Sequence, residues 1–105
     1  MPKSIVVCKV DDIRTGQARR FFVLDRNISI IRIDDNFYAI GDTCSHQNYS
    51  LSEGTVMAED LEIECPKHGS TFDLLTGEPR SLPATRPVPV YTVEVAGGEV
   101  KVVIE

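Results

Sequence analysis

The chain has 105 residues, of which 42% are hydrophobic, and a net charge of −5, which suits one domain (residues 1–105) with a single modest core. The negative charge argues against nucleic acid or an anionic membrane surface as the main partner. No apolar stretch reaches the roughly 18 residues of a membrane-spanning helix, and the first ten residues lack the pattern of a signal peptide.

Short strands separated by turns are predicted along the first 41 residues. Apolar, β-branched runs predict strands at residues 4–10, 18–24, 27–33 and 37–41. Turns are expected at 11–17 and 34–36, and Asp25 and Arg26 are expected to form the two-residue loop of a hairpin. No apolar repeat with helical spacing extends over a helix-length window.

The composition of the sequence changes after residue 41, where glycines and prolines break the chain into loops. Short strand-like pieces remain at 55–57, 61–64 and 70–74, and the alternating segments 90–95 and 99–104 then predict a hairpin across Ala96-Gly97-Gly98. An all-β chain of short strands predicts a sandwich or a small barrel. The loop-rich insert is a natural carrier of function, since loops held on a rigid scaffold often form sites.

Two matching pairs of metal-binding residues lie in this insert. Cys44 and His46 are separated by one residue and Cys65 and His68 by two, and together they use both histidines of the chain. A structural zinc site is one interpretation, but such sites usually place two ligands of one kind in each loop. Mixed loops favour a binuclear centre with both thiolates on one iron and both imidazoles on the other, the ligand division of Rieske clusters.

The sequence resembles the Rieske-type ferredoxins, the electron carriers of bacterial aromatic-ring-hydroxylating dioxygenase systems. The resemblance lies in "CSH" and "CPKHGSTFD", and in the flanking "LSEGTV" and "LPATRPVPVYTVEV". It implies an antiparallel β-sandwich base with a small cluster-binding subdomain at about residues 42–86. It also implies one 2Fe–2S cluster, held by Cys44 and Cys65 on the inner iron and by His46 and His68 on the outer iron.

The resemblance has departures that bear on the redox potential. High-potential respiratory members join their two loops by a disulfide, and the matching positions here are Tyr49 and Lys67. Those members also donate hydrogen bonds to cluster sulfur from a serine and a tyrosine, at positions where this chain has Ser70 and Phe72. Because such hydrogen bonds raise the potential, we expect a value below the respiratory class.

Two further residues are expected beside the cluster. Gly69 would let the backbone pass close to the cluster or adopt a positive φ, although plain turn chemistry is an equal alternative. Pro83 resembles a proline that stiffens the loops around the cluster. Cys8, which lies in a predicted strand, is expected to be a small buried residue.

The same resemblance implies an electron carrier and not an enzyme. No histidine remains for the mononuclear iron of an oxygenase, and no glycine-rich nucleotide motif is present. The implied partners are a flavin-dependent NAD(P)H reductase and a terminal oxygenase. A carrier for another reductase or for iron–sulfur assembly, and a zinc-stabilised binding module without a redox role, remain as alternatives.

Two composition features concern location and docking. The odd number of cysteines fits a reducing cytoplasm rather than a disulfide scaffold. Acidic residues crowd the stretch between the two loops, which is either a solvated face or a docking surface for basic partners; they are Glu53, Glu59, Asp60, Glu62 and Glu64.

Overall fold

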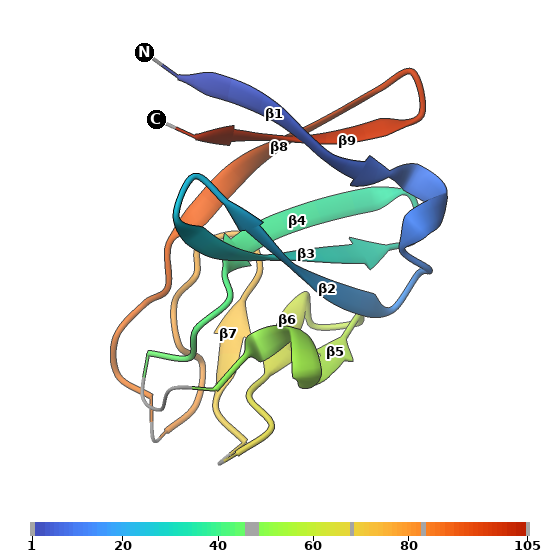
Figure 1. Cartoon of the computed structure of the whole chain (residues 1–105). Helices are drawn as coiled ribbons and strands as arrows, with labels where there is room; N and C mark the ends of the chain where they lie inside the picture. The colour runs from blue at the N-terminus through green and yellow to red at the C-terminus, as the bar shows by residue number, and fades with distance from the viewer. Residues whose placement is uncertain (1, 46–48, 68, 83, 105) are drawn as a thin grey trace.

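The computed structural model describes residues 2–45, 49–67, 69–82 and 84–104. These residues form nine β-strands and two single-turn 3-10 helices (Figure 1). The strands are β1 (Lys3–Lys9), β2 (Gln17–Val23), β3 (Arg26–Ile33), β4 (Asn36–Gly41), β5 (Thr55–Met57), β6 (Glu62–Glu64), β7 (Thr71–Asp73), β8 (Val90–Ala96) and β9 (Glu99–Ile104), and the 3-10 turns are η1 (Val10–Asp12) and η2 (Leu51–Glu53). The predicted all-β class is confirmed.

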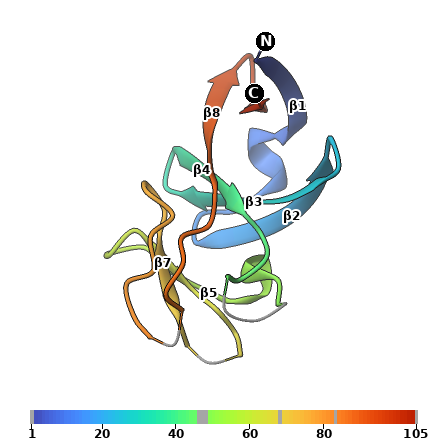
Figure 2. The same ribbon diagram turned by 90° about the vertical axis from the view of Figure 1, so that its left-hand side faces the viewer.

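The base of the molecule is one antiparallel sheet that curls into a sandwich. Its strand order is β1-β9-β8-β4-β3-β2, and its two halves are paired where Ala39 faces Tyr91 and Ile40 faces Val90. Figures 1 and 2 show the curl of this sheet. Apolar side chains from both halves pack together in one core. The predicted alternation along β9 is confirmed, since Val100, Val102 and Ile104 are buried in this base core.

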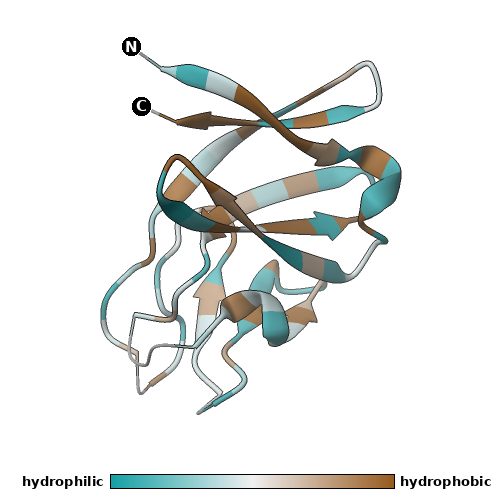
Figure 3. Ribbon diagram, viewed as in Figure 1, coloured by the Kyte–Doolittle hydropathy of each residue, from teal (hydrophilic) through white to brown (hydrophobic). Residues whose placement is uncertain are grey.

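Strand β3 carries two cores because both of its faces are covered. Ile28 and Ile30 enter the base core, whereas Ile31 and Ile33 enter a second core that the insert shares with the base. Hydrophobic residues, coloured brown, occur along β3 and again in the strands of the insert (Figure 3). Each fully buried isoleucine stabilises this arrangement by roughly 1.5–3 kcal/mol, which fixes the insert on the base.

The insert contains a second, three-stranded antiparallel sheet of order β5-β6-β7. Ile63 of β6 and Phe72 of β7 face each other in register and are both buried in the second core. The chain then returns along residues 79–89 to β8, so that the loops after β4 and β6 lie on the side of the insert away from the base (Figure 2). Within the described part of the chain, no helix is long and apolar enough to span a membrane.

The details of two turns differ from the predictions. The β2–β3 hairpin turns at Leu24 and Asp25, not at Asp25 and Arg26, because Val23 pairs with Arg26 and both loop residues adopt positive φ. The expected turn at 11–17 begins as η1. Phe22 is 69% exposed, because it lies on the outward face of the edge strand β2 beside the hairpin.

Candidate metal centre

The first ligand loop leaves the end of β4 and is closed by backbone hydrogen bonds. The Cys44 amide donates to the Tyr49 carbonyl at 2.9 Å, and Thr43 and Ser50 form an antiparallel bridge. Leu51 anchors the returning arm, because its side chain is fully buried in the second core. Cys44 therefore lies at the mouth of a narrow loop and is only 4% exposed.

The second ligand loop leaves the end of β6 and repeats this design. The Cys65 amide donates to the Ser70 carbonyl at 2.7 Å, and the Gly69 amide donates to the Cys65 carbonyl at 3.2 Å. Gly69 has φ +75°, so this position does require the conformation that glycine adopts at least cost. Cys65 is 2% exposed, and each loop thus pairs its cysteine amide with the carbonyl five residues later.

The two cysteines share one apolar environment. Cys44 and Cys65 belong to the same buried cluster, together with Leu51, Phe72 and Ala84. None of the three cysteines, all of which the structure describes, forms a disulfide. Two buried thiols that come from separate loops suit the shielded, thiolate-ligated iron of a 2Fe–2S cluster, so the residues present fit the sulfur side of that group. His46, His68 and Pro83 lie outside the described residues.

Side-chain contacts link the ligand loops to each other and to the return segment. The Lys67 ammonium lies 5.6 Å from the centre of the Tyr49 ring, a cation–π distance. These are the two positions at which respiratory members are expected to carry a disulfide. The Ser45 hydroxyl donates to the Arg86 carbonyl at 2.5 Å, which holds the first loop against the return segment.

The return segment also pairs with β7 and encloses the second loop. The Arg80 amide donates to the Thr71 carbonyl at 2.7 Å, and the Thr71 amide donates to the Ser81 hydroxyl at 3.0 Å. The Ala84 amide donates to the Ser70 hydroxyl at 3.1 Å. Ser70 is 1% exposed, and a hydroxyl that accepts one hydrogen bond can still donate its own hydrogen.

Gly54 connects the two ligand loops sterically. It follows η2 and packs directly on β6, where a Cβ atom would overlap the Glu64 carbonyl oxygen. Glu64 immediately precedes Cys65. The close approach of these backbones therefore sets how near the first loop lies to the second.

The outer face of the three-stranded sheet is acidic. Glu62 and Glu64 of β6 are half-buried, and Glu62 pairs in register with Asp73 of β7. Asp73 accepts from the Arg80 guanidinium at 2.7 Å and from the amides of Leu75 and Thr76. These bonds, led by that from Arg80, hold the pKa of Asp73 below its ordinary value. Glu53, Glu59 and Asp60 are exposed.

Sequence reasoning did not single out the polar residues that support the loops. Asp42 is 2% exposed and accepts from Ser50 and Ser52. The Asp73–Arg80 pair likewise ties β7 to the return segment. The available signal was local, because Asp42 lies directly after a predicted strand and two residues before Cys44.

Comparisons with known proteins agree with this geometry. Residues 3–92 match the Rieske [2Fe-2S] domain. The 3-phenylpropionate/cinnamic acid dioxygenase ferredoxin subunit of Escherichia coli strain K12 is 42% identical over 98 residues, which cover 91% of this chain and 89% of that protein.

Solved structures show the same fold over nearly the whole chain. The ferredoxin of carbazole 1,9a-dioxygenase from Nocardioides aromaticivorans IC177 superposes with a TM-score of 0.92 at 39% identity, covering 95% of this chain and 96% of that one. A chain in the complex of reduced oxygenase and oxidized ferredoxin in carbazole 1,9a-dioxygenase superposes with a TM-score of 0.87 at 44% identity, covering 94% of this chain and 91% of that one. The chain therefore belongs to the Rieske [2Fe-2S] domain family, as an electron-carrying ferredoxin with one Rieske 2Fe–2S cluster and not as a catalytic oxygenase subunit.

Proposed function

We propose that this ferredoxin serves a multicomponent ring-hydroxylating dioxygenase in the cytoplasm. It takes single electrons from a flavin-dependent NAD(P)H reductase and delivers them to the terminal oxygenase. The observation that carries the proposal is the pair of buried cysteines, Cys44 and Cys65, at the mouths of two loops of matching design on one core. The choice of partners is supported by a 42% identical relative named as a dioxygenase ferredoxin subunit and by the oxygenase–ferredoxin complex.

The proposed ligands divide by residue type between the two iron atoms. Cys44 and Cys65 bind the inner iron, and His46 and His68 bind the outer iron. When bound, the cluster supplies a one-electron redox couple. The protein contributes shielding, because Leu51 and Phe72 are fully buried beside the two thiols and keep water from them.

Docking is proposed at the end of the molecule that carries the ligand loops. Leu82 is 77% exposed and Tyr49 is 39% exposed, so the return segment and the first ligand loop each present a large side chain to solvent. The acidic outer face of the β5-β6-β7 sheet lies next to them. We expect association with a partner whose contact surface is basic, and we expect it to weaken with salt because exposed charges are screened within about 10 Å at 0.1 M ionic strength.

The ligand proposal is tested by metal analysis and electron paramagnetic resonance. We expect iron and acid-labile sulfide in equal amounts, and a rhombic signal after reduction by dithionite that disappears in His68→Ala. A colourless protein that holds one zinc ion and gives no signal would establish the zinc-stabilised module instead.

The partner proposal is tested by electron transfer. The reduced protein is mixed in a stopped-flow instrument with the oxygenase component of the E. coli 3-phenylpropionate dioxygenase. We expect rapid oxidation of the ferredoxin that slows as salt increases. If oxidation is no faster than with an unrelated Rieske acceptor, the dioxygenase assignment is wrong, although the cluster assignment stands.

Ser70 is predicted to raise the midpoint potential. Its buried hydroxyl accepts from Ala84 and retains a hydrogen that can be donated to cluster sulfur. Ser70→Ala should lower the midpoint by on the order of tens of millivolts in protein-film voltammetry. Ser29→Ala is the matched control, because Ser29 is equally buried but lies in β3 of the base. Equal midpoints for the two variants would contradict this role.

A further inference from the structure

Asp42 joins three parts of the molecule at the root of the first ligand loop. Its amide donates to the Asn27 carbonyl of the base at 3.0 Å, and its carbonyl accepts from the Leu51 amide at 2.6 Å. Its carboxylate accepts from the Ser50 hydroxyl at 2.5 Å and from the Ser52 amide at 3.0 Å. Asp42 is 2% exposed, so these bonds are made away from water, where each is stronger than in solvent.

These bonds give η2 the cap that its own N-cap residue does not supply. The N-terminal amides of a helical turn have no partners within the turn. Ser50 occupies the N-cap position without a side-chain cap bond, because its hydroxyl turns to Asp42 instead. Asp42 satisfies the first two amides of η2, that of Leu51 through its carbonyl and that of Ser52 through its carboxylate.

The capped turn fixes the returning arm of the loop. Leu51 is fully buried in the core that also contains Cys44, and the arm just before it accepts the Cys44 amide through the Tyr49 carbonyl. A change at Asp42 should therefore shift Cys44 in two ways, through the two peptide bonds that separate them and through the returning arm that holds the Cys44 amide. Both side-chain oxygens of Asp42 accept hydrogen bonds, so the side chain is held at both ends of its carboxyl group.

We infer that Asp42 is the positioning residue of the first ligand loop, and that its buried negative charge lowers the midpoint potential of the cluster. The second half of this inference rests on the proposed ligation by Cys44. A fixed negative charge close to a redox centre disfavours the added electron, and low local polarity strengthens the effect. Loop geometry and charge can be separated experimentally because asparagine keeps the shape of the side chain.

The test compares Asp42→Asn with Asp42→Ala. In Asp42→Asn the side-chain oxygen can still accept from Ser52, and its nitrogen can donate to the Ser50 hydroxyl, so the loop is kept and the charge is removed. Asp42→Ala removes both. Asp34→Asn is the charge-matched control, because Asp34 is exposed in the β3–β4 turn at the other end of β4 from the ligand loop.

Three readouts are made on the protein as purified: cluster content, midpoint potential by voltammetry, and hydrogen exchange of the peptide spanning Leu51–Glu53 by mass spectrometry. Asp42→Asn should keep cluster content and exchange, and should favour reduction at least twofold, about 18 mV for a one-electron couple at 59 mV per tenfold. Asp42→Ala should speed exchange at least tenfold and lower cluster content. Asp34→Asn should change none of the three.

Two results would overturn the inference. A midpoint for Asp42→Asn no higher than that of Asp34→Asn would remove the electrostatic role. Wild-type exchange in Asp42→Ala would remove the positioning role. A wild-type protein without a 2Fe–2S signal would instead reject the proposed function, and the exchange measurement would still decide the positioning role because it needs no cluster.

Discussion

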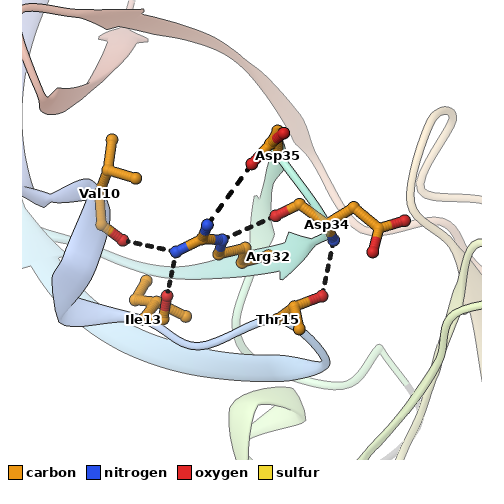
Figure 4. Close-up of polar contacts among 6 residues, drawn as sticks. All are labelled: Val10, Ile13, Thr15, Arg32, Asp34 and Asp35. Atoms are coloured by element: carbon orange, nitrogen blue, oxygen red, sulfur yellow. Dashed lines mark hydrogen bonds and ion pairs between the residues drawn. The ribbon is translucent and has the colours of Figure 1, made fainter.

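Arg32 bonds to the segment that connects the two halves of the base. Its removal should destabilise the fold without changing the redox potential of the cluster. Its guanidinium donates to the carbonyls of Val10 and Ile13 at 3.0 Å each and to that of Asp34 at 2.7 Å (Figure 4). Val10 and Ile13 flank or belong to η1, which links β1 of one half to β2 of the other. The Arg32 side chain is only 19% exposed.

The magnitude follows from the bonds that are lost. Arg32→Met keeps the apolar stem but leaves three carbonyls without this donor, at about 1 kcal/mol each for partly exposed positions, or about 3 kcal/mol in all. The ion pair of Arg32 with the fully exposed Asp35 contributes little, because surface pairs are worth about 0–1 kcal/mol. At 4–8 °C per kcal/mol for a domain of this size, the thermal midpoint should fall by roughly 12–24 °C.

Thermal unfolding at one fixed scan rate, followed by circular dichroism, measures this shift. Arg32→Lys should lose part of the stability, because a single ammonium cannot reproduce the planar fork. Asp35→Asn is the control and should change the midpoint by only a few degrees. The redox potential should stay unchanged in all three variants, since Arg32 pairs with Phe37 at the end of β4 opposite to the ligand loop.

A fall of less than about 4 °C in Arg32→Met, or one equal to that of Asp35→Asn, would refute this reasoning. It would mean that water replaces the guanidinium at these carbonyls without a loss of stability. A changed redox potential would show that the base and the ligand loops are coupled more strongly than the two separate cores indicate.

Three further predictions concern the ligand loops. The pKa of Asp73 is lowered first by the Arg80 guanidinium. Asp73 therefore contributes stability above the unfolded carboxyl pKa of about 3.9, and this stability is lost as pH falls through the lower folded pKa. The difference in thermal midpoint between wild type and Asp73→Asn should shrink below about pH 4 and stay constant from pH 6 to 8. Lys67→Met removes the contact with Tyr49, and at about 0.5 kcal/mol it should speed cluster loss to a chelator about twofold, measured by visible absorbance; an unchanged rate in Lys67→Met would show that this contact does not hold the loops. Gly54→Ala forces two backbones apart and should reduce cluster content by more than half, whereas full loading would show that β6 can shift freely.

The secondary structure was largely readable from local patterns. β-Branched residues at alternate positions indicated β9 and its buried face at Val100 and Val102, and the glycine pair after Ala96 indicated the hairpin before it. The β2–β3 turn was misplaced by one residue because Leu24 adopts a positive φ that its residue type does not favour. The pairing of Val23 with Arg26 decides that turn, and such pairing depends on the whole sheet.

The sequence indicated the ligand types of the candidate site but not the contacts that hold the ligand loops in place. The spacing of Cys44 and Cys65 from the two histidines was enough to predict a mixed-ligand iron–sulfur centre, because ligands of one centre must come from a few close positions. The burial of both thiols in one core required the fold. The role of Ser70 was expected, while its bond from Ala84 was visible only once the return segment lay against β7.

The sequence by itself determined the strand periodicity, the two ligand pairs and the absence of spare histidines, because each is a property of residues close together in the chain or of its composition. Only the tertiary structure decided that Asp42 caps η2 and that Arg32 holds the carbonyls around η1. In both cases a charged side chain bonds backbone groups, which every residue carries alike. Residue types therefore do not identify the bonded partners, because the fold decides which backbone groups lie within reach.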